Sequence, residues 1–221
     1  YRLGDFYEMF FEDAVLAAPL LGLVLTARHK DSDIEAPMCG VPHHALESYV
    51  AKLVAAGKKV AISEQTEAPS KGKSLVARRI VRVITPGTIV DAERLDSRRA
   101  NELASLAFEG ERAALGFLDV STGEFSVLHL ADGTRPEEWL ERRPVREVVC
   151  FPSDQRAVEA MLARLSEPPV VSVLAGESPR GRSASDLLLA HFHTSTLDAF
   201  GLPPAGAPVE AAAALLHYAR T

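Results

Sequence analysis

The alternation of apolar and polar positions predicts a chain of short helices and strands. Two runs have apolar residues at helical spacing: residues 12–21 and 45–56. Three runs have the pattern of strands: residues 22–28, 59–63 and 79–85, of which the last is rich in β-branched residues. The intervening segment APMCGVPHH has the composition of a turn, and residues 67–74 have that of a flexible loop. These elements predict a first α/β domain that closes near residue 96.

From about residue 101 the pattern changes to three short strands joined by tight turns. The apolar runs are LASLAF, ALGFLDV and EFSVLHL, which is typical of an antiparallel meander. Helix-like and strand-like runs then alternate: residues 136–142, 147–151, 154–165, 170–173, 184–192 and 209–220. Strands first and α/β units afterwards predict a second α/β domain. We therefore expect an α/β fold with two domains, residues 1–96 and 97–221.

Composition narrows the class of protein. The chain has 221 residues, of which 47% are hydrophobic, enough for two domains with real cores. No run approaches the roughly 18 apolar residues of a membrane span. The start YRLGDFYEMF lacks the regions of a signal peptide, and Cys39 and Cys150 form no metal-type pair. We expect a soluble, intracellular protein with two reduced thiols. The absence of an initial Met leads us to expect a piece of a longer protein.

The net charge of −6 argues against a free-standing basic nucleic-acid-binding domain. The charge is nevertheless unevenly distributed. Between Lys52 and Arg82 there are eight basic and two acidic residues, a local net charge of +6. This segment is either a solvated basic face or a surface that binds phosphates.

Four strings in order along the chain carry a resemblance to a known family. They are GDFYE (residues 4–8), PMCGVPHHA (37–45), AISEQ (61–65) and VITPGT (83–88), and GFLDVSTGEF (116–125) and the final ALLHYART extend them. On these strings the whole chain resembles the MutS family of DNA mismatch repair proteins. The resemblance implies a mixed-sheet α/β mismatch-binding domain up to residue 96, followed by a ribonuclease-H-like connector domain. It also implies that the clamp, lever and ATPase parts of the family are absent.

The resemblance assigns mismatch sensing to the Phe-x-Glu element, here Phe6 and Glu8. In an extended segment these two side chains point to the same face. An aromatic wedge in the minor groove unstacks neighbouring bases, and a mispaired step resists this less than a matched one. The alternative is that Phe6 and Phe10 are ordinary core residues of an apolar strand.

Five basic residues match basic or loop positions of the same family, where they would bind phosphates and the groove edge. They are Arg28, Lys71, Lys73, Arg78 and Arg79. The alternative is that several of these residues are solvated surface charges that do not contact DNA. The local departure His29-Lys30-Asp31 leaves the contacts of that loop open.

Three features of the sequence resemble enzyme or metal sites and are alternatives to the DNA-binding interpretation. Gly72-Lys73-Ser74 resembles the end of a phosphate-binding loop, but the motif's first glycine would fall at Glu67. Cys39, His43 and His44 have metal-capable atoms, yet the intervening Gly40-Val41-Pro42 has the composition of a tight turn. Asp119 and Glu124 resemble the acids of a metal-dependent ribonuclease-H-like nuclease, which needs several converging carboxylates. This nuclease and general DNA binding without mismatch sensing are the two alternative functions.

The function implied by the resemblance is non-enzymatic recognition of mispaired or unpaired bases in duplex DNA during mismatch repair. No cofactor is expected in this segment, since ATP and Mg²⁺ belong to the absent ATPase domain. The implied partners are mismatched duplex DNA, a second copy bound through the missing C-terminal part, and a MutL-like repair protein at the connector domain. The implied location is the bacterial cytoplasm, in association with the nucleoid and not with a membrane.

Overall fold

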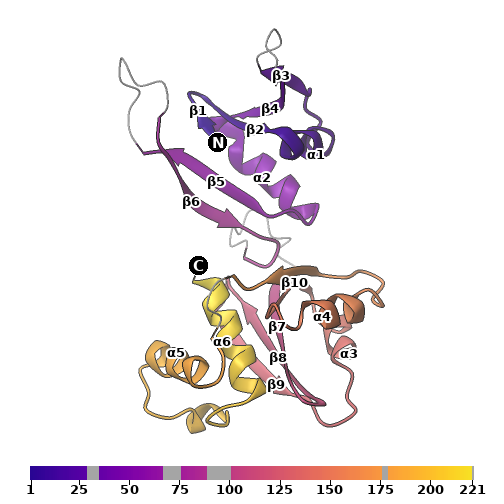
Figure 1. The fold of residues 1–221 in the computed structure, drawn as a ribbon, viewed down its shortest axis with the longest axis vertical. Coiled ribbons are helices and arrows are strands. Elements are labelled where there is room, and N and C mark those ends of the chain that lie inside the picture. The colour runs from indigo at the N-terminus through magenta and orange to yellow at the C-terminus, as the bar shows by residue number, and fades with distance from the viewer. Residues whose placement is uncertain (29–34, 67–75, 89–100, 176–178, 221) are drawn as a thin grey trace. The chain divides into compact units, whose positions relative to one another are not determined.

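The computed structural model divides the chain into two compact units, Tyr1–Pro86 and Gly87–Thr221 (Figure 1). It describes residues 1–28, 35–66, 76–88, 101–175 and 179–220. Both units combine helices with sheets, so the predicted two-domain α/β class is confirmed. The predicted domain boundary between residues 96 and 97 lies outside the described residues.

Unit 1 contains a four-stranded sheet in the order β1-β2-β4-β3, in which every pair of neighbours is antiparallel. Its strands are β1 (Arg2–Leu3), β2 (Phe6–Phe10), β3 (Thr26–Arg28) and β4 (Ala36–Pro42). The other elements are α1 (Phe11–Leu21), the 3-10 helix η1 (His43–Ala45), α2 (Leu46–Ala55), and the antiparallel strands β5 (Val60–Gln65) and β6 (Arg78–Ile84). The two helices and the two paired strands predicted by periodicity are thus present, with ends shifted by one or two residues.

Strand alternation sends one set of side chains of this sheet into the core of unit 1. Tyr7, Cys39 and Val41 are buried, and the Cys39 thiol lies 3.7 Å from the Ala14 carbonyl oxygen of α1. Burial raises the pKa of the Cys39 thiol. Helices α1 and α2 therefore cover this face, and the residues of β2 with even numbers point to the opposite face.

The segment 37–42, predicted as a turn, is a strand, so that prediction is wrong. It forms most of β4, which pairs with β2 on one side and β3 on the other. The misleading composition has a physical explanation. Pro37 and Pro42 stand near the two ends of the strand, where a missing N–H is tolerated, and the buried residues Cys39 and Val41 alternate as they do in a half-buried strand.

Unit 2 contains a five-stranded mixed sheet in the order β11-β10-β7-β8-β9. Strands β7 (Glu102–Glu109), β8 (Arg112–Asp119) and β9 (Glu124–His129) form the predicted antiparallel meander. Strands β10 (Val145–Cys150) and β11 (Val170–Val173) add to it in parallel, with β10 next to β7. Three antiparallel strands followed by two parallel ones is the arrangement expected of a ribonuclease-H-like fold.

Helices cover both faces of the unit 2 sheet. Figure 1 shows α6 (Ala207–Ala219) lying across β7, β8 and β9, with α5 (Arg182–Phe192) beside it. The 3-10 helix η2 (Asp198–Phe200) precedes α6. Helices α3 (Pro136–Glu141) and α4 (Gln155–Leu162) pack on the other face against Ala104 and Leu106. None of the described helices is long and apolar enough to cross a membrane.

A buried carboxylate lies at the centre of unit 2. Glu147 of β10 is fully buried and accepts hydrogen bonds from the Gly87 amide (2.9 Å), the Tyr218 hydroxyl (2.6 Å) and the Ser172 hydroxyl. A Cβ on Gly87 would lie 2.8 Å from the Leu103 side chain and 3.0 Å from Glu147, so only glycine fits there. The glycine of the VITPGT string is therefore fixed by the core of unit 2.

Candidate nucleic-acid interface

Strand β2 places Phe6 and Glu8 on the face of the sheet opposite to the helices. Phe6 is 48% exposed, whereas the intervening Tyr7 is 7% exposed. The alternative that Phe6 is a core residue is therefore wrong. Phe10 follows on the same side by strand alternation and is half-buried. We call the surface formed by Phe6, Glu8, Phe10 and their cross-strand neighbours the open face.

The strand register fixes the neighbours of the two predicted sensing residues. Phe6 lies opposite Leu3 of β1 and Pro42 of β4, so its cross-strand partners on both sides are apolar. Glu8 lies opposite Gly40 of β4, which has no side chain. Because cross-strand partners point to the same side, β4 places no side chain next to Glu8 on the open face.

Arg28 joins Glu8 across the open face. Its Nη1 donates to Glu8 Oε2 at 3.3 Å, with side-chain exposures of 46% for Arg28 and 18% for Glu8. The same guanidinium lies 5.9 Å from the ring centre of Phe10, within range of a cation–π contact. The sequence predicted a phosphate contact for Arg28 but gave no sign that Glu8 would be its partner in the protein alone.

A second polar network supports β2 from its buried side. The Tyr7 hydroxyl donates to Glu64 Oε1 of β5, and Glu64 Oε2 lies 3.6 Å from Arg2 Nη1. Burial, followed by the hydrogen bond to Glu64, raises the pKa of Tyr7 to about 12. The ring of Tyr7 also stacks on His43 at a centroid distance of 6.4 Å. These contacts position the strand that carries Phe6 and Glu8.

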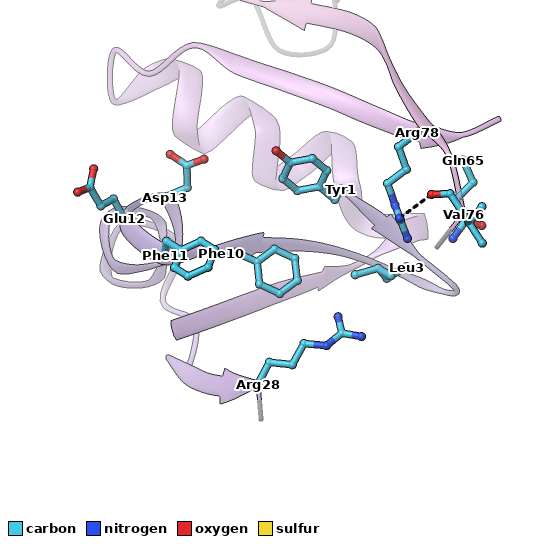
Figure 2. Close-up of a pocket in the computed structure, with 10 residues that line it drawn as sticks. All are labelled: Tyr1, Leu3, Phe10, Phe11, Glu12, Asp13, Arg28, Gln65, Val76 and Arg78. Atoms are coloured by element: carbon cyan, nitrogen blue, oxygen red, sulfur yellow. Dashed lines mark hydrogen bonds between the residues drawn. The ribbon is translucent and has the colours of Figure 1, made fainter. Parts of the chain in front are cut away.

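An open groove of about 1050 Å³ borders the open face (Figure 2). Its lining combines aromatic, acidic and basic side chains: Tyr1, Leu3, Phe10, Phe11, Glu12, Asp13, Arg28, Gln65, Val76 and Arg78. Figure 2 shows Glu12 and Asp13 at one end, on α1, and Arg28 and Arg78 away from them. The groove therefore has an acidic end, and its two arginines lie away from that end.

The other predicted basic residues differ in their burial and in the hydrogen bonds that they make within the protein. Arg78 is half-buried, and its guanidinium donates to the carbonyl oxygens of Val76 (3.0 Å) and Arg2 (3.4 Å). Arg79 is exposed on β6. Lys71 and Lys73 lie outside the described residues. Of the two described arginines, Arg79 is thus the one whose removal would disturb the fold less.

The comparisons with known proteins match both units. Residues 1–93 match the family model described as MutS domain I, and residues 101–221 match the model described as MutS domain II. The chain belongs to the MutS family. The four strings between residues 4 and 88 therefore lie in MutS domain I, and the ribonuclease-H-like unit corresponds to MutS domain II.

Curated MutS relatives are similar over nearly the whole chain. The DNA mismatch repair protein MutS of Syntrophobacter fumaroxidans is 42% identical over 220 residues, which cover 99% of this chain and 25% of that protein. The MutS of Myxococcus xanthus is also 42% identical over 220 residues, and that of Anaeromyxobacter dehalogenans strain 2CP-C is 44% identical over 218; each match covers 99% of this chain and 24% of the relative. The chain thus spans about a quarter of the length of these relatives.

In MutS domain II, Asp119 has a local structural role. Its Oδ1 accepts hydrogen bonds from the Ser121 amide (2.8 Å), the Ser121 hydroxyl (2.6 Å) and the Thr122 amide (3.3 Å). This is the pattern by which an aspartate stabilises a tight turn. Among the described residues no group of three His, Cys, Asp or Glu side chains is placed to hold a metal ion. The turn between β8 and β9 accounts for the hydrogen bonds of this aspartate.

Proposed function

We propose that this chain recognises mispaired or unpaired bases in duplex DNA, with Phe6 as the wedge. The observation that carries the proposal is an aromatic ring 48% exposed on a sheet face, where a core phenylalanine would be buried. The ring is held on a paired strand and flanked by Leu3 and Pro42, so little conformational freedom is lost when it inserts between bases. Membership of a family named for DNA mismatch repair supports the same function.

Glu8 supplies selectivity in this proposal. A mispaired thymine presents an N3–H that a carboxylate oxygen can accept, and the base edge reaches Glu8 once the duplex kinks around Phe6. Matched DNA resists the kink, so the carboxylate stays beside the phosphates and repels them. In the protein alone the guanidinium of Arg28 lies 3.3 Å from the carboxylate of Glu8. When the base edge takes the place of Arg28 beside Glu8, the guanidinium becomes available to bind a phosphate.

The two arginines of the groove continue the proposed DNA path. Arg28 and Arg78 line the groove and would face the sugar-phosphate backbone. Glu12 and Asp13 line it at the end on α1 and would repel phosphates, which keeps the path away from that end. Lys71, Lys73 and Arg79 remain proposed phosphate contacts, because their charge suits the role.

The second domain acts in this proposal as a connector that relays the DNA-bound state to the rest of the protein. We propose no chemistry for either unit; ATP and Mg²⁺ would be bound by a separate ATPase domain. We further propose dimerisation through a part of the protein outside this chain, a MutL-like partner at the connector domain, and action on the bacterial nucleoid in the cytoplasm. The domain boundary at residue 96 remains part of the same proposal.

Substitution of Glu8 tests the proposed selectivity. In a full-length protein carrying this chain, Glu8→Ala is expected to tighten binding to matched duplex about fivefold, the value of roughly 1 kcal/mol of charge repulsion at 4 Å in water. The mismatch-to-match affinity ratio should fall. Glu8→Gln should restore mismatch binding better than Ala, since its amide can donate to a purine N7. Parallel titrations with matched, G·T and single-base-insertion duplexes measure all three values.

Glu12→Ala is the matched control for this experiment, because it removes an acid from the groove without touching Glu8. It should leave the mismatch-to-match ratio unchanged. Unchanged affinity of Glu8→Ala for matched duplex would contradict the repulsion argument.

Substitution of Arg79 tests the phosphate role. Arg79→Gln is expected to weaken matched and mismatched binding equally and to lower the slope of log affinity against log salt by about 0.9, the value of one phosphate contact. Arg112→Gln, an exposed arginine of unit 2, is the control and should leave the slope unchanged. Selective loss of mismatch binding in Arg79→Gln with an unchanged slope would show that the phosphate role is wrong.

A further inference from the structure

Gly40 lies at a position where a glycine lowers the stability of the fold. It lies in the interior of β4, which is paired on both sides, and it belongs to the PMCGVPHHA string. Glycine loses more backbone entropy than any other residue on folding and provides no side chain to pack in a strand. Some property of this site must therefore require the absence of a side chain.

The backbone does not require glycine here. Gly40 is not among the described glycines with a positive φ, so an L-residue can adopt its conformation without strain. Crowding does not require it either. A Cβ built on Gly40 would lie 3.4 Å from Glu8 Cγ and 3.4 Å from the Tyr7 carbonyl oxygen, which is ordinary van der Waals contact. In Gly87 and Gly116, by comparison, the added Cβ would come within 2.8 Å and 2.7 Å of core atoms.

The position of Gly40 relative to the proposed sensing residues gives the remaining reason. Gly40 is the direct cross-strand partner of Glu8, and its Cβ position lies 4.0 Å from Phe6 Cδ1. A side chain longer than a methyl group would stand on the open face beside the carboxylate and the ring edge. A glycine in a strand interior commonly marks a place where a ligand or another backbone approaches closely.

We infer that Gly40 is a specificity-determining residue, which keeps a notch open between Phe6 and Glu8 for the edge and sugar of a mispaired nucleotide. This inference rests on the proposed function and adds a residue to it. Phe6 makes the duplex kink, Glu8 offers the acceptor, and the gap at Gly40 lets the displaced base come within hydrogen-bonding distance of that acceptor. Matched duplex, which does not enter the notch, is unaffected by its size.

The test is a size series at residue 40 in a full-length protein carrying this chain. Gly40→Ala, Gly40→Ser and Gly40→Val are compared with the parent for binding to matched and G·T duplexes, together with their melting temperatures. The control Ala61→Val adds a β-branched side chain at an exposed position of strand β5, opposite Val83. A variant with Phe6→Ala provides the reference for complete loss of sensing.

We expect the mismatch-to-match ratio to decrease in the order Ala, Ser, Val, with a loss of at least about tenfold for Gly40→Val, since a steric block excludes one partner selectively. Matched-duplex affinity should stay constant. The melting temperature of Gly40→Val should equal or exceed that of the parent, because β-branched residues favour strands. Ala61→Val should change none of these values.

Two results would overturn the inference and leave the proposed function standing. One is an unchanged mismatch-to-match ratio in Gly40→Val while Phe6→Ala loses it. The other is a melting temperature that falls through the series in step with the ratio, which would assign Gly40 to packing. Retention of mismatch preference in Phe6→Ala would instead contradict the proposed function itself.

Discussion

A full-length protein carrying Phe6→Ala is expected to bind a G·T duplex no more tightly than a matched duplex. Removal of one stacking aromatic costs about 1–3 kcal/mol per base, a factor of roughly five to 150 in mismatch affinity. Matched-duplex affinity should change little, because it depends on phosphate contacts. The measurement is a pair of equilibrium titrations at one fixed salt concentration.

The effect of Phe6→Ala on the stability of the fold also distinguishes a wedge residue from a core residue. Truncation of a buried phenylalanine costs about 3–5 kcal/mol, but Phe6 is half exposed, so the loss should be well below that range. Phe200→Ala is a matched control, since Phe200 is 52% exposed in unit 2. It should keep the mismatch preference. A large fall in melting temperature with unchanged discrimination in Phe6→Ala would contradict the wedge assignment.

Replacement of Glu147 by alanine is expected to destabilise unit 2 by about 3–5 kcal/mol, the cost of breaking a buried polar network and leaving its donors unpaired. The donors are the Gly87 amide and the Tyr218 and Ser172 hydroxyls. They come from the start of the unit, from α6 and from β11, so the loss should spread through all three. Hydrogen exchange of peptides from β10, β11 and α6 measures it element by element.

Two variants control this experiment. Glu147→Gln keeps the size of the side chain and one acceptor oxygen, so it should lose less protection than Glu147→Ala. Glu124→Ala removes an exposed glutamate from β9 of the same sheet and should change stability by less than about 0.5 kcal/mol. Unchanged protection of β10 and β11 in Glu147→Ala would show that the carboxylate is not the centre of this network.

The sequence predicted the elements whose hydrophobic period is strong. The meander β7–β9, the strand β11 and the helices α2 and α6 lie where periodicity placed them. The expectation that Phe6 and Glu8 share a face also follows directly from strand alternation, and β2 confirms it. The strand β4 was missed because glycine and two prolines outweighed the alternation of Cys39 and Val41, a signal that was present in the sequence.

The contacts around the candidate site depend on pairing between distant residues, which periodicity does not reveal. Tyr7 reaches Glu64 across 57 positions, and Gly87 reaches Glu147 across 60. One signal for Glu147 was available, since it directly precedes the apolar run of β10 and a buried charge needs partners. No local pattern predicted that Arg28 would bind Glu8, because that ion pair requires the register of both β2 and β3 on β4.

Base unstacking beside a mismatch tests the central claim most directly. A G·T duplex with 2-aminopurine at the step next to the mismatch brightens when that base loses its stacking neighbour. Saturation with the full-length parent is expected to raise the fluorescence, while Phe6→Ala at saturating concentration leaves it at the level of free duplex. An equal rise with both proteins would show that Phe6 does not open the step, and it would contradict this account of the open face.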